Sequence, residues 1–70
     1  MRFDDPIVKK IYIAVTNMEI NLDELAKQIH TNRSTIYKRM NRPETFKLDE
    51  LRAISKVLRI DIGELVRGRR

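Results

Sequence analysis

The sequence predicts an all-α fold built from five short helices, and three observations support it. Apolar residues recur at helical spacing in successive segments of the chain. Residues that cap helices stand just before several of these segments. The 70 residues include only two glycines and two prolines, which argues against a long disordered segment. We therefore expect a single domain, 1–70, near the smallest size at which a core is stable without disulfides or metals.

The first helix is predicted to begin after Asp5, because aspartate caps helices and Pro6 suits the first helical position. Thr16 and Asn17 are expected to end it. The residues expected on its inward face are Ile7, Ile11, Ala14, Val15 and Met18, with Val8, Tyr12 and Ile13 widening that face.

Residues 21–40 predict two short helices joined by a tight turn. Asn21 is a good N-cap, and Glu24 follows it at the spacing of a capping box. The helix of about 22–29 has an apolar stripe made of Leu22, Leu25, Ala26 and Ile29. A turn at His30 leads to a second cap, Asn32, and to a helix of about 33–40. The whole arrangement is typical of a helix-turn-helix.

The last third of the chain predicts two more helices. Pro43 indicates that the residues after 40 form a loop, because proline lacks a donor and biases the preceding residue away from helix. A helix of about 48–58 comes next, with apolar positions at Phe46, Leu48, Leu51, Ile54, Val57 and Leu58. Asp61 and Glu64 form a further cap pair that opens a short helix ending at Gly68.

Four aliphatic residues near the C-terminus allow two interpretations. They either close the core or form an exposed contact between two copies of the chain. These dimer candidates are Ile60, Ile62, Leu65 and Val66.

Composition excludes several classes of protein. The chain has no cysteine and one histidine, so we expect no metal site and no cofactor. No apolar run is long enough to cross a bilayer, and we expect a soluble protein of the cytoplasm without membrane contact. An enzyme is the least expected class, because no nucleophile–base pair or glycine-rich phosphate loop is present.

The net charge of +5 is concentrated in two places. Residues 1–30 and 48–66 each carry a net charge of −1. Residues 31–47 carry five basic side chains against Glu44 alone, and a basic tail at 67–70 adds three arginines. The excess positive charge therefore coincides with the second helix of the predicted motif and the loop after it.

The segment ELAKQIHTNRSTIYKRM, 24–40, together with FKLDELRAISKVLRIDIGELV, 46–66, resembles the phage Cro and XRE-type helix-turn-helix repressor family. The similarity extends over nearly everything from Pro6 to Arg67. Two positions differ from the family pattern. His30 stands where the family usually has glycine, often with a positive φ, and Arg39 stands where it often has a buried aliphatic. Met40 is positioned to fill the space of that aliphatic.

The resemblance implies a lambda-repressor-like bundle that inserts the helix 33–40 into the major groove of DNA. The residues it places for reading bases are Arg33, Ser34, Tyr37 and Lys38. Each has an alternative role: Arg33, Ser34 and Lys38 can bind phosphates instead, and Tyr37 can pack along the helix flank. His30 is interpreted as a turn residue.

The resemblance also implies contacts with the DNA backbone at the start of the helix 22–29, near the start of the helix 33–40 and in the loop after it. The expected phosphate-binding residues are Asn21, Leu22, Asn32, Thr35, Arg42, Thr45 and Lys47. Asn21 and Leu22 belong to this set because a helix N-terminus favours an anion. Lys47 belongs to it because lysine is a poor cap for the helix that starts at Leu48.

Two hypotheses for function are compatible with these observations. The first is a sequence-specific double-stranded DNA-binding transcriptional regulator, a Cro-like repressor acting as a homodimer on an operator with an inverted repeat. The alternative is a protein-interaction modulator with the same fold, which binds a partner repressor instead of DNA. The uneven charge favours the first.

Overall fold

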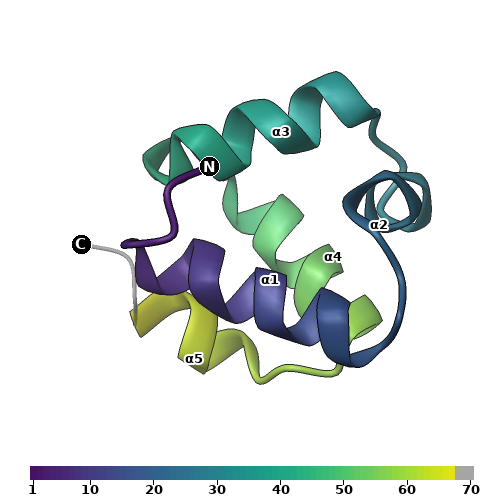
Figure 1. The fold of residues 1–70 in the computed structure, drawn as a ribbon. Coiled ribbons are helices and arrows are strands. Elements are labelled where there is room, and N and C mark those ends of the chain that lie inside the picture. Colours follow the sequence, from purple (N-terminus) through teal and green to yellow (C-terminus); the bar gives the residue numbers. More distant parts are fainter. Residues whose placement is uncertain (68–70) are drawn as a thin grey trace.

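The computed structural model describes residues 1–67, which form five α-helices and one short 3-10 helix. These are α1 (Pro6–Asn17), α2 (Leu22–Gln28), α3 (Arg33–Asn41), η1 (Pro43–Thr45), α4 (Leu48–Leu58) and α5 (Ile62–Arg67). In Figure 1, α3 lies on one side of the bundle, α1 and α5 lie on the other, and α4 runs between them. The all-α prediction is confirmed. Of the predicted basic tail, residues 68–70 and the helix end at Gly68 lie outside the described residues.

The predicted caps of the first three helices are present. The Asp5 carboxylate accepts hydrogen bonds from the backbone N–H groups of Ile7 and Val8, at 2.8 and 3.3 Å. Asn21 and Asn32 cap α2 and α3 in the same way, each accepting a 2.8 Å bond from the backbone N–H three residues later. Each cap satisfies a donor that has no partner within its helix, which explains why the helices begin at these residues.

Three helices end in the same left-handed turn, made without glycine. Glu19, His30 and Arg59 have φ values of 57°, 61° and 56°. After each of them, the next residue donates its backbone N–H to the carbonyl five positions earlier, at 3.2, 2.8 and 3.0 Å. This six-to-one bond is typical of the Schellman motif, which usually has glycine at the left-handed position. The positive φ expected at His30 is therefore confirmed, and the bond after it holds the turn between α2 and α3.

The buried face of α1 is narrower than the sequence predicts. Four of its residues are buried, namely Ile7, Val8, Ile11 and Val15. Tyr12, Ile13 and Met18 are exposed, contrary to expectation. Consecutive residues of a helix are rotated by about 100°, so Tyr12 and Ile13 turn away from the face defined by Ile11. Met18 is the C-cap residue and lies beyond the last helical position.

The core gathers buried side chains from every α-helix and from the segment before α4. Phe46 is the largest of them and lies just before α4 instead of within it. From α3, only Ile36 and Met40 are buried. Met40 is fully enclosed, as expected for a residue that fills the position of the family's usual aliphatic.

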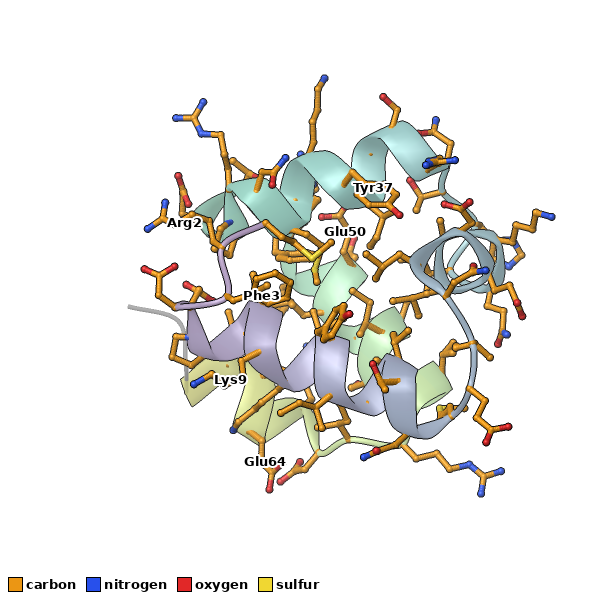
Figure 2. The ribbon with its side chains drawn as sticks, viewed as in Figure 1. Arg2, Phe3, Lys9, Tyr37, Glu50 and Glu64 are labelled. Atoms are coloured by element: carbon orange, nitrogen blue, oxygen red, sulfur yellow. The ribbon has the colours of Figure 1, made fainter. Side chains whose placement is uncertain are left out.

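Arg39 joins α3 to α4 through an ion pair with Glu50. Its Nε donates to both carboxylate oxygens of Glu50, at 3.0 and 3.3 Å, and both side chains are 21% exposed. Glu50 also accepts a 2.8 Å bond from the backbone N–H of Lys47, which caps the start of α4. Figure 2 shows Glu50 lying beneath α3. One carboxylate therefore both starts α4 and fixes α3 beside it.

We expect Glu50→Gln to lower the free energy of unfolding by about 1–2 kcal/mol, because the amide keeps an acceptor for Lys47 but loses the charged bond with Arg39. Asp49→Asn is the matched control, since Asp49 is an exposed acid in the same helical turn. It should cost less than about 1 kcal/mol, the size of a helix-dipole effect. Urea unfolding of both variants measures the difference. Equal losses would show that the pair with Arg39 contributes nothing specific.

Candidate nucleic-acid interface

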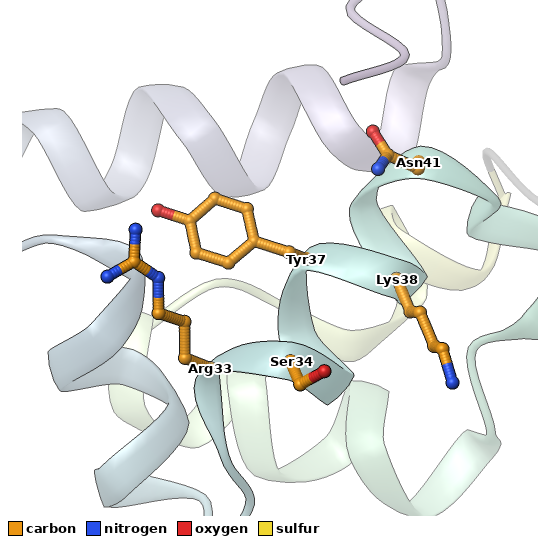
Figure 3. A pocket seen from close by; sticks show the side chains of 5 residues that line it. All are labelled: Arg33, Ser34, Tyr37, Lys38 and Asn41. Carbon is orange, nitrogen blue, oxygen red and sulfur yellow. The ribbon is translucent and has the colours of Figure 1, made fainter.

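One face of α3 presents a continuous set of polar side chains. Five residues line a shallow hollow on this face: Arg33, Ser34, Tyr37, Lys38 and Asn41 (Figure 3). They are spaced three or four positions apart, so they form adjacent rows along one side of the helix. All are exposed except Tyr37, which is half-buried. Four of them are the residues expected to read bases, and the structure places all four together.

Asn41 is a member of this face that the sequence interpretation did not include. The sequence predicts that the helix ends at about 40 and that Asn41 lies in the loop, whereas α3 extends to Asn41. One further helical position brings it into line with Tyr37, four residues earlier. The spacing of 34, 37, 38 and 41 was the available indication.

Arg33 is held by groups from two helices. Its Nη1 lies 3.5 Å from Oδ2 of Asp23 on α2, and its guanidinium carbon lies 5.3 Å from the centre of the Tyr37 ring. Figure 3 shows the Tyr37 ring between α3 and α1, with Arg33 beside it, whereas Ser34 and Lys38 of the same face point away from that ring. The Tyr37 ring also packs against the core cluster, so this side chain both anchors α3 and contacts Arg33.

The residues expected at phosphates near the start of α2 and α3 are largely occupied with capping. The side-chain oxygens of Asn21 and Asn32 accept backbone N–H groups, and the donor for Asn32 is Thr35. The Leu22 side chain is buried, which leaves only its backbone N–H for an anion. Asp23 and Glu24 add two carboxylates to the first turn of α2, and these oppose a phosphate there.

The residues expected at phosphates after α3 differ in how free they are. Arg42 is paired with Glu44 at 3.6 Å, but both side chains are well exposed, so water or an anion competes easily for Arg42. The Thr45 hydroxyl donates to the carbonyl of Arg42 at 2.6 Å, and a phosphate contact through its proton requires that bond to break. Lys47 is exposed and its side chain makes no capping bond. Arg42 and Lys47 are thus the better candidates.

The C-terminal aliphatic group divides between the two interpretations. Leu65 is 0% exposed and belongs to the core, so of the two interpretations core closure holds for this residue, and it is not available for a dimer contact. Val66 is 40% exposed, and Ile60 and Ile62 are half-buried. A groove between α1 and α5 exposes Ile60 together with Ile13, which is 52% exposed. The exposed apolar surface near the C-terminus therefore includes Ile13 and does not include Leu65.

Residues 12–67 match the family described as Cro/C1-type HTH DNA-binding domain. The match begins within α1 and ends at the last residue of α5, so it includes the helix-turn-helix and all of the later helices. The chain belongs to this family. Its members are DNA-binding domains and not enzymes, and the resemblance to Cro and XRE-type proteins is confirmed. No curated protein and no solved structure gives a significant match to the chain.

Membership in the family implies that DNA is the partner of this chain. The second helix of the helix-turn-helix motif is α3. No helix within residues 1–67 combines the length and apolar character that a bilayer crossing requires.

The two C-terminal residues Leu65 and Val66 should respond differently to truncation. Leu65→Ala leaves a cavity in the core and should lower the free energy of unfolding by about 2–5 kcal/mol. Val66→Ala on the exposed side of the same helix should change it by less than about 0.5 kcal/mol. Thermal or urea unfolding measures both variants. Comparable losses at the two positions would contradict the assignment of Leu65 to the core.

Proposed function

We propose that this Cro/C1-type domain is a sequence-specific transcriptional regulator, a Cro-like repressor that inserts α3 into the major groove of double-stranded DNA. The observation that carries the proposal is the set of five polar side chains lining one hollow along α3. Two of them are cations and none is acidic. A helix fits the major groove, where each base pair presents a distinct pattern of donors and acceptors.

The five side chains carry the chemistry that base recognition needs. Arg33 and Lys38 are donors suited to the O6 and N7 acceptors of guanine. Asn41 offers the paired donor and acceptor that match the N6 and N7 edge of adenine. Ser34 can bond to either kind of edge, and the Tyr37 ring can contact a thymine methyl group. These assignments extend the base-reading set by Asn41.

Backbone contacts at both ends of α3 would set its register in the groove. We assign these contacts to Arg42 and Lys47 after α3, to Asn32 and Thr35 at its start, and to the Asn21 side chain and the Leu22 backbone N–H at the start of α2. Thr45 is the least suitable of the predicted residues, because its hydroxyl proton is engaged by Arg42. Phosphate contacts fix position and carry no sequence information.

We further propose that the chain binds as a homodimer on an inverted repeat. One small module reaches only a few base pairs, and pairing two of them on half-sites about one helical turn apart increases specificity. The aliphatic side chains that support a contact between copies are Ile13 and Val66, which are exposed, and Ile60 and Ile62, which are half-buried.

The same aliphatic surface supports the alternative function, a modulator that binds a partner repressor. Isolated exposed apolar residues are ordinary, but Ile13 and Ile60 line one groove at the junction of α1 and α5. A modulator would bind its protein partner tightly and bind DNA only weakly and without sequence preference.

Selection from a pool of random duplexes at fixed salt separates these functions. The proposed regulator should enrich one motif, and a dimer should enrich an inverted repeat with half-sites about 10 base pairs apart. Enrichment of a single half-site would contradict the proposed dimer but would support the proposed regulator. Failure to enrich any sequence would contradict the proposed regulator and would favour the modulator.

We expect Arg42→Ala to reduce the salt dependence of DNA binding by about one unit of slope in log K against log salt, because each neutralised phosphate releases about one counterion. Arg52→Ala is the matched control, since Arg52 is an exposed arginine on α4 outside the proposed interface. Binding measured between 50 and 200 mM salt, about the range over which such slopes are resolved, gives both values. An unchanged slope for Arg42→Ala would show that Arg42 does not contact a phosphate.

A further inference from the structure

The pairing between Arg33 and Asp23 joins an acidic residue to the basic face of α3. Asp23 lies in the first turn of α2, and its Oδ2 is 3.5 Å from Nη1 of Arg33. The Arg33 side chain is 72% exposed and that of Asp23 is 42% exposed. An ion pair this open contributes little to folding stability. Its main consequence is therefore where it places the guanidinium.

The two carboxylate oxygens of Asp23 lie in different surroundings. Its Oδ2 faces Arg33, whereas its Oδ1 is buried and has no hydrogen-bond partner within residues 1–67. An acceptor withdrawn from water without a partner costs free energy. Arg33 is therefore the only partner that the Asp23 carboxylate has within residues 1–67.

Two contacts together restrict the orientation of the Arg33 guanidinium. Asp23 lies at the Nη1 corner, and the Tyr37 ring lies 5.3 Å from the central carbon. A guanidinium has five donors arranged in a rigid fork. With Nη1 directed at Asp23, the edge formed by Nε and Nη2 remains, and it has the two parallel donors that guanine O6 and N7 require.

We propose that Asp23 is a positioning residue for base recognition, which orients Arg33 toward guanine without contacting DNA itself. The inference rests on the proposed function, because it requires that Arg33 reads a base. The Asp23 carboxylate also affects the overall affinity for DNA, and this effect is unfavourable. A negative charge beside the DNA backbone weakens binding to every sequence, so Asp23 lowers overall affinity while it raises discrimination.

Glu24 provides a matched control for Asp23. It is the next residue in the same turn of α2, it is acidic and exposed, and it forms no ion pair within residues 1–67. Asp23→Ala and Glu24→Ala each remove one negative charge from the same helix end. Both should therefore raise affinity for random duplex DNA to a similar extent.

The test uses two duplexes, the one that the wild type selects and the same duplex with a single guanine replaced. The replaced guanine is the position at which Arg33→Ala loses its sequence preference. Asp23→Ala should reduce discrimination at that guanine by about 5- to 10-fold, a part of the roughly 10- to 100-fold that a bidentate contact provides. Glu24→Ala should leave it unchanged. In the Arg33→Ala background, adding Asp23→Ala should change discrimination no further, since the two residues act through one contact.

Equal discrimination by Asp23→Ala and the wild type, measured on a sequence that the wild type does enrich, overturns the positioning role and leaves the proposed function intact. If the wild type enriches no sequence, the proposed function fails and the positioning role fails with it. Thermal unfolding of each variant shows that it is folded, and Asp23→Ala is expected to change stability little, because the loss of a first-turn acid opposes the gain from removing a buried, unpartnered oxygen.

Discussion

The anchoring of α3 is the constraint on which the rest of this structure depends. Only Ile36 and Met40 of this helix are buried, so its outer face is free for polar residues. Two buried side chains four positions apart fix which face of a helix turns inward, but they resist rotation about their own line only weakly. The Arg39–Glu50 pair and the half-buried Tyr37 ring lie to the sides of that line and restrict the rotation.

The turns between helices show how a chain with few glycines makes sharp reversals. Each left-handed residue without glycine costs roughly 1–2 kcal/mol of backbone free energy. The bonds from Ile20, Thr31 and Ile60 to carbonyls five residues back offset part of that cost, and so does the burial of the helices that the turns bring together. At His30 this geometry sets the angle between α2 and α3, and it brings Asp23 and Arg33 within reach of each other.

Much of the fold and of the candidate site was predictable because it depends on local chemistry. Asp5, Asn21 and Asn32 mark helix starts through bonds to residues two or three positions away. The face of Arg33, Ser34, Tyr37 and Lys38 follows from helical spacing alone. Asn41 was missed because the end of a helix depends on the residues after it, here Pro43 and η1. Asp23 was missed because its partner belongs to another helix, and no spacing in sequence reveals that.

The sequence by itself determined the five helices, the caps of the first three, the basic face of α3 and the family resemblance, since each depends on residues close together in the chain. The tertiary structure alone decided that Leu65 joins the core while Ile13 stays exposed, because burial depends on which helices meet. It also decided that Arg39 pairs with Glu50 and Arg33 with Asp23. Both pairs join residues on different helices, and only the packing of those helices brings opposite charges within contact distance.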